Sequence, residues 1–155
     1  MRPARGSPDI LILGYGNELR RDDGVGPRVA RLIEALRLPN VRAEARHQLT
    51  PEWAEPLSQV RAAIFVDASL AGVPGTAEIR PVAPVAPSPL GGHLSDPGAL
   101  LALTRAVYHR APDAWLITVA AQDLGVGEQL SAAGQQGLAA ALAGARDLIV
   151  RLGFV

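Results

Sequence analysis

Three side chains that can bind a metal ion follow apolar or proline-rich stretches of the sequence. Asp23 lies in a turn rich in glycine and aspartate after residues 9–14, and Asp67 follows the apolar run 62–66. His93 comes after a segment rich in proline. Two carboxylates and one imidazole suit a divalent ion such as Zn²⁺ or Ni²⁺ and leave positions open for water or substrate. Because the three residues are 44 and 26 positions apart, they form a site only if the fold brings them together.

Each of these residues also has a simpler structural interpretation. Asp22 and Asp23 precede an amphipathic stretch, where an aspartate commonly caps a helix and contributes roughly 1 kcal/mol. Asp67 could cap a loop, and an isolated histidine such as His93 is usually a surface residue. The metal-site hypothesis therefore depends on the three residues taken together.

Strands and helices alternate along the chain. Residues 9–14 and 62–68 are short apolar runs, typical of strands buried on both faces. Further strands are predicted at residues 41–45, 75–82 and 115–119, and the strand at 75–82 is expected to be antiparallel. Helices are predicted at residues 27–36, after Thr50, at 97–110 and at 131–152. This order indicates an α/β fold with a mostly parallel sheet covered on both faces. Ligands of such sheets bind at the carboxyl ends of the strands, which is where we expect Asp67.

The composition limits the classes of function. The chain has 155 residues, 15 Lys and Arg, 15 Asp and Glu, and no cysteine. We expect a single domain over residues 1–155, with 1–8 as a flexible N-terminal tail. Dispersed, balanced charge argues against nucleic acid, and no apolar stretch approaches the roughly 20 residues needed to span a membrane. Cysteine ligands are excluded, and the lack of a signal peptide and of an extra apolar stripe predicts a cytoplasmic monomer.

Gly14 and Gly16 raise the alternative of a dinucleotide-binding turn. The third glycine of that fingerprint would stand at position 19, where the chain has Leu19. Asp22 and Asp23 would repel a phosphate in the same turn. The nucleotide-binding alternative is therefore disfavoured.

A longer motif covers the same turn. Residues 14–26 read Gly-Tyr-Gly-Asn-Glu-Leu-Arg-Arg-Asp-Asp-Gly-Val-Gly and match G-x-G-N-x-L-x-x-D-[DE]-G-x-G at every fixed position. This signature resembles the opening motif of the hydrogenase maturation endopeptidases. Three later stretches of the chain also resemble motifs of that family. They are residues 65–68 with 73–76, residues 92–95 with 100–101, and residues 127–131.

The resemblance implies a three-layer α/β/α sandwich with a mostly parallel, twisted sheet of about five strands. It implies an endopeptidase that removes the C-terminal extension of a nickel–iron hydrogenase large-subunit precursor after nickel insertion. Asp23, Asp67 and His93 would be its metal-binding and catalytic residues. The nickel would be borne by the substrate, with zinc or cadmium as a surrogate, and hydrolysis would be aspartyl-type or metal-assisted.

Two points stay open at the level of sequence. A non-catalytic nickel-binding or chaperone-like module on the same fold would need the same three ligands. Residues 46–52 depart from the Asp-Gly-Gly-type turn found in members of the family, which leaves the substrate specificity undetermined.

Overall fold

The structure is a computed structural model that describes residues 8–86 and 96–153. His93 lies outside the described residues, as does the tail predicted at 1–8 apart from residue 8.

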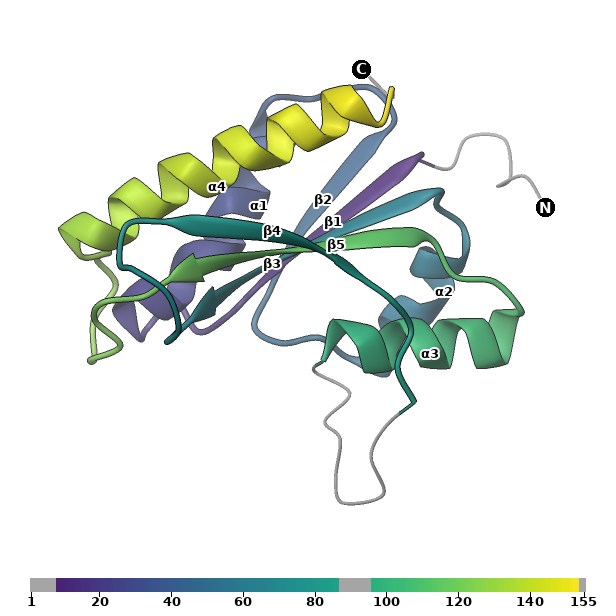
Figure 1. Cartoon of the computed structure of the whole chain (residues 1–155), viewed down its shortest axis with the longest axis horizontal. Coiled ribbons are helices and arrows are strands. Elements are labelled where there is room, and N and C mark those ends of the chain that lie inside the picture. Colours follow the sequence, from purple (N-terminus) through teal and green to yellow (C-terminus); the bar gives the residue numbers. More distant parts are fainter. Residues whose placement is uncertain (1–7, 87–95, 154–155) are drawn as a thin grey trace.

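Five strands form one twisted sheet in the order β2-β1-β3-β5-β4 (Figure 1). The strands are β1 Ile10–Tyr15, β2 Val41–Arg46, β3 Ala62–Ser69, β4 Ala77–Val82 and β5 Asp113–Ala120. β4 runs antiparallel to β5, and all other pairs are parallel. The carboxyl ends of β1, β2, β3 and β5 therefore lie along one edge of the sheet, as the sequence predicts for a site there.

Helices cover both faces of the sheet (Figure 1). One face carries α1 Val25–Ala35 and α4 Ala132–Arg151, and the other carries α2 Ala54–Ser58 and α3 Pro97–Tyr108. Two 3₁₀ helices, η1 Arg21–Gly24 and η2 Pro51–Trp53, precede α1 and α2. The predicted three-layer α/β/α architecture is confirmed.

The two apolar layers follow from the alternation of side chains along the strands. In β1, Ile10 and Ile12 face α1 and α4, whereas Leu11 and Leu13 face α2 and α3. All four are fully or almost fully buried. β1 is thus a central strand whose apolar side chains pack into the apolar layers on both faces of the sheet. For this reason its sequence is a continuous apolar run.

The start of α1 packs directly on the backbone of the sheet. A methyl group on Gly14 would overlap the carbonyl oxygen of Gly26, and one on Gly26 would lie 2.5 Å from the carbonyl oxygens of Tyr15 and Val66. The glycines of this turn are therefore needed for close helix–strand packing. The backbone of α1 occupies the space beside Gly14, which gives no support to the nucleotide-binding alternative.

The start of α1 differs from the sequence prediction. The helix begins at Val25, directly after η1, rather than at Pro27. Its N-cap residue is Gly24, and no side chain caps it. The interpretation of Asp22 and Asp23 as caps of this helix is therefore wrong, and both carboxylates have other partners. None of the helices within residues 8–86 and 96–153 has the length and apolar character to cross a membrane.

Candidate functional site

Asp23 is held by the loop between β1 and α1. Gly16 has a φ of +148°, and a side chain there would overlap the carbonyl oxygen of Asp23, so the loop folds tightly back on η1. The backbone N–H of Asn17 donates to Oδ2 of Asp23 at 2.7 Å, and the Asn17 side chain accepts from the N–H of Leu19 at 2.9 Å. These bonds fix the Asp23 carboxylate at the carboxyl edge of the sheet.

Asp67 lies near the end of β3, on the face covered by α2 and α3. It shares this face with Phe65, and it is partly buried. The pairing of Gly14 with Val66 places Tyr15, the next residue of β1, beside Asp67. The Tyr15 hydroxyl donates a hydrogen bond to the Asp67 carboxylate. Two neighbouring strands thus end in a tyrosine and an aspartate in contact.

The two carboxylates influence each other electrostatically. The pKa of Asp67 is raised from 3.8 to about 6, chiefly by burial and further by the charge of Asp23. Hydrogen bonds from the Ala68 backbone and the Tyr15 hydroxyl lower it in part. Burial and the charge of Asp67 also raise the pKa of Tyr15, so the phenol keeps its proton. A divalent cation between Asp23 and Asp67 would relieve the repulsion between them.

The structure brings Asp23 and Asp67 together, and the predicted third ligand, His93, lies outside the described residues. α3 begins next to this edge: Asp96 caps it by accepting a hydrogen bond from the Gly98 N–H at 2.9 Å, and the charge of Asp96 acts on Tyr15. Within residues 8–86 and 96–153, no group of three histidine, aspartate or glutamate side chains could hold a metal ion. The three-residue ligand set therefore stays a prediction.

Asp22, the neighbour of Asp23, has a different role. It is 1% exposed and accepts hydrogen bonds from the backbone N–H groups of Gln122, Asp123 and Ser131 at 2.8–3.0 Å. The Ser131 hydroxyl also donates to it at 2.7 Å, while Ser131 caps α4 by accepting from the Gly134 N–H. Burial alone would raise the pKa of Asp22, but these hydrogen bonds outweigh it and lower the pKa. Asp22 joins η1 to the start of α4.

Sequence reasoning missed the roles of Tyr15 and Asp22. The sequence does contain a signal for Tyr15, because its hydroxyl is a polar group at the last position of a buried strand. Asp67 is predicted as a site residue from the same kind of position, near the end of another buried strand. Asp22 carries no local signal, because its partners follow it by 100 to 109 positions. His47 directly follows β2 and has an exposed side chain.

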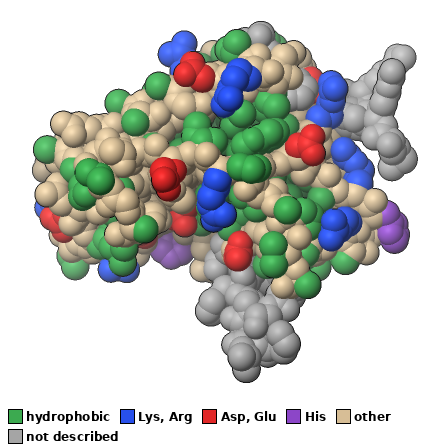
Figure 2. All heavy atoms as spheres, in the orientation of Figure 1, with side chains coloured by type: hydrophobic (Ala, Val, Ile, Leu, Met, Phe, Trp, Pro, Cys, Tyr) green, Lys and Arg blue, Asp and Glu red, His purple; other side chains and the backbone are tan. Residues whose placement is uncertain are grey.

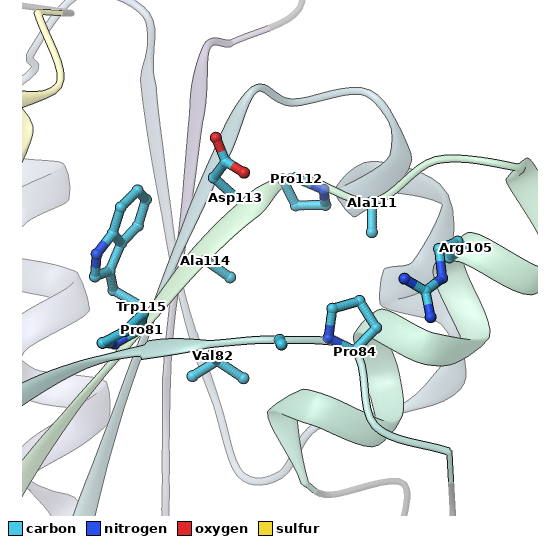
Figure 3. A pocket seen from close by; sticks show the side chains of 10 residues that line it. Pro81, Val82, Pro84, Arg105, Ala111, Pro112, Asp113, Ala114 and Trp115 are labelled. Atoms are coloured by element: carbon cyan, nitrogen blue, oxygen red, sulfur yellow. The ribbon is translucent and has the colours of Figure 1, made fainter.

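A cavity of about 360 Å³ lies at the opposite end of the sheet (Figure 3). Its walls include the first residues of β5, Asp113 and Ala114, whereas Asp67 pairs with Thr118 near the end of that strand. Arg105 lies across the cavity from Trp115 (Figure 3). The cavity is therefore separate from the candidate site.

Comparison with known proteins identifies relatives through the fold. No profile of a protein family and no curated protein sequence matches the chain. Among solved structures, hydrogenase maturating endopeptidase HybD from E. coli is similar with a TM-score of 0.72 and 25% identity, over 99% of this chain and 94% of that one. The chain has the fold of the hydrogenase maturation endopeptidases.

Two archaeal structures in this fold group are similar over comparable lengths. A hydrogenase 2 maturation peptidase from Thaumarchaeota archaeon SCGC_AB-539-E09 has a TM-score of 0.69 and 24% identity, over 94% of this chain and 99% of that one. The [NiFe] hydrogenase maturation protease HybD from Thermococcus kodakarensis has a TM-score of 0.69 and 22% identity, over 96% and 99%. The family resemblance seen in the sequence motifs is thus confirmed by the fold along nearly the whole chain.

Proposed function

We propose that this protein is an endopeptidase that removes the C-terminal extension of a nickel–iron hydrogenase large-subunit precursor after nickel insertion. Nickel is part of the substrate in this proposal, and Asp23, Asp67 and His93 bind it while the scissile bond is positioned. Zinc and cadmium are suitable surrogates for the nickel ion. The protein acts in the cytoplasm.

The adjacency of Asp23 and Asp67 carries the proposal. Their carboxylates come from segments 44 residues apart in the sequence, and the charge of one raises the pKa of the other. This pair lies at the edge where open α/β sheets bind their ligands. The same fold over nearly the full chain length is found in solved proteins named as hydrogenase maturation peptidases.

The chemistry of the pair suits recognition of a loaded metal centre. Two carboxylates that repel each other gain most when a cation enters between them, so binding favours a precursor that already carries its ion. A bound metal polarises a nearby carbonyl and lowers the pKa of a bound water. Asp23 and Asp67 hold the cation and orient the adjacent peptide bond, and hydrolysis follows at or beside that position.

Incubation of the purified protein with a nickel-loaded large-subunit precursor, read by intact mass, tests the proposal. We expect the wild type to release a short C-terminal peptide and His93→Ala to release none. Asp67→Asn keeps the side-chain volume and should also lose processing. His109→Asn is the matched control, because His109 is the C-cap residue directly after α3 and has a φ of 63°, a conformation that asparagine tolerates.

Each outcome has a separate meaning. Cleavage by the wild type and by His109→Asn, but not by His93→Ala, supports the peptidase and its site together. Binding of the loaded precursor without cleavage by any variant would overturn the peptidase and support the non-catalytic nickel-binding or chaperone-like module. Full processing by Asp67→Asn would remove Asp67 from the site.

A further inference from the structure

Tyr15 stands at the boundary between the apolar core and the candidate site. It is the last residue of β1 and is 7% exposed, and its ring belongs to the apolar cluster under α2 and α3. The pairings of the sheet place Leu13, Phe65 and Leu116 in one row of this face. The core therefore fixes the ring of Tyr15, and with it the position of the hydroxyl.

The next row of the same face is polar. Tyr15 pairs with Arg46 of β2 on one side and lies beside Asp67 on the other, and Asp67 pairs with Thr118 of β5. In this row the Tyr15 hydroxyl is the donor to the Asp67 carboxylate. A phenol is suited to this place, since its ring completes the apolar layer while its oxygen reaches the polar row.

We propose that Tyr15 is a positioning residue, whose buried hydroxyl holds the Asp67 carboxylate in one orientation beside Asp23 for the incoming cation. This inference rests on the metal-ligand role that the proposed function gives to Asp67. It adds a residue that the sequence signature leaves open, because position 15 is an unspecified x in G-x-G-N. The role belongs to the side chains of this particular chain.

The physical reason is the freedom of an unsupported carboxylate. An aspartate side chain rotates about two bonds, and a ligand that must first be ordered binds its ion more weakly. Hydrogen bonds to metal-ligating carboxylates remove this freedom, and their loss typically lowers metal affinity by about 10- to 100-fold. Asp23 has a comparable support from the Asn17 N–H, so both carboxylates are held before the ion arrives.

Tyr15→Phe removes the hydroxyl and keeps the ring. The chain has two tyrosines, and Tyr108, the last residue of α3 and 39% exposed, gives the matched control Tyr108→Phe. The measurement is a Ni²⁺ titration of the purified full chain followed by NMR line broadening, which reaches weak affinities. We expect the Kd for Ni²⁺ to rise about 10- to 100-fold in Tyr15→Phe and to match the wild type in Tyr108→Phe. The thermal unfolding midpoint of Tyr15→Phe, measured in parallel, reports any loss of packing separately.

A double-mutant cycle with Asp67→Asn separates positioning from general damage. If Tyr15 acts through Asp67, Tyr15→Phe has no further effect on the Ni²⁺ affinity once Asp67→Asn is present. Weaker binding in Asp67→Asn together with an unchanged Kd in Tyr15→Phe would overturn the positioning role and leave the proposed site standing. A wild type without a saturable Ni²⁺ response would overturn this inference, because Asp23 and Asp67 would then hold no free cation. The proposed function, in which the precursor brings the nickel, is tested separately by precursor cleavage.

Discussion

Asp22 and Asp67 have opposite electrostatic settings. Asp22 is buried among four hydrogen-bond donors that favour its charged form, whereas Asp67, which faces Asp23, is buried beside another carboxylate. The hydrogen bonds to Asp22 stabilise the fold, whereas the repulsion between Asp67 and Asp23 would be relieved by a bound cation. The residue types alone do not distinguish these roles; the neighbours do.

Asp22→Asn should lower the free energy of unfolding by about 2–4 kcal/mol, measured by urea denaturation. Asparagine has one acceptor oxygen, and its amide nitrogen would face N–H donors of Gln122, Asp123 or Ser131. Asp123→Asn is the control, because its side chain is exposed and pairs with Arg21 at 3.1 Å; we expect a change below about 1 kcal/mol. Equal effects of the two substitutions would show that Asp22 is not the link between η1 and α4.

The raised pKa of Asp67 predicts a pH dependence of stability. Because its pKa is about 6 in the folded protein and 3.8 otherwise, the folded state binds more protons between these values. The free energy of unfolding contributed by this group therefore falls as the pH rises from about 4 to about 6 and is level above that. Asp67→Asn should be more stable than the wild type at pH 8 by about 1–2 kcal/mol, with the difference vanishing near pH 4. A difference that does not depend on pH would contradict this assignment.

At the scale of elements, α4 combines weak helix propensity with close packing. Its glycines lower its intrinsic stability, as the sequence indicates, but two of them are required by neighbours. A methyl group on Gly134 would overlap Oδ1 of Asp22, and one on Gly137 would overlap the Val119 side chain. α4 thus depends on contacts with η1 and β5.

Three alanine substitutions in α4 test this dependence by thermal or urea unfolding. Gly134→Ala should be strongly destabilising because the Asp22 carboxylate is fixed by its hydrogen bonds. Gly137→Ala should be less so, because the added methyl group meets an apolar methyl of Val119 and breaks no hydrogen bond. At Gly144 a methyl group would lie 2.8 Å from Cδ1 of Ile79, the flexible end of a side chain that is 37% exposed. Gly144→Ala should therefore stabilise the protein by about 0.5 kcal/mol through helix propensity. Destabilisation of equal size at all three positions would contradict this ranking.

The elements were predictable where each one carries its own pattern. The apolar runs at 9–14 and 62–68 predict β1 and β3, and the cap at Ser131 predicts the start of α4; all three are confirmed. The placement of Asp67 at the carboxyl edge follows from its strand. The order of the strands is not encoded locally, and without β1 beside β3 the contact between Tyr15 and Asp67 could not be derived.

The start of α1 shows the limit of local reasoning. Pro27 and the preceding aspartates look like a helix start and its caps, yet the turn is continued by η1 and α1 begins two residues earlier. Tertiary contacts determine where α1 begins, because Asp22 accepts a hydrogen bond from Ser131 at the start of α4 and Asp23 accepts one from Asn17. The capping preference, worth about 1 kcal/mol, is smaller than a buried network of four hydrogen bonds.

At the scale of the molecule, both edges of the sheet resist pairing with another chain. β2 carries Arg42, Glu44 and Arg46, in which Glu44 forms ion pairs with both arginines at 3.2 and 3.3 Å. β4 carries Arg80 and Pro81, and proline has no N–H to donate. Acidic and basic side chains are interspersed on the face shown in Figure 2. Charged residues and proline on edge strands are known to oppose association through the edge.

We therefore expect a monomer of 16.2 kDa by light scattering at all concentrations that remain soluble. Replacing both Arg80 and Pro81 with valine provides a sensitive comparison, since it restores an N–H and removes a charge on the β4 edge. This variant should show a mass that rises with concentration, because its edge strand can pair with a second copy. A wild type with twice the monomer mass would contradict the expected monomer and show that a contact between copies forms in solution. The valine variant would then locate it, because a dimer through the β4 edge responds to these substitutions and a dimer through a helical face does not.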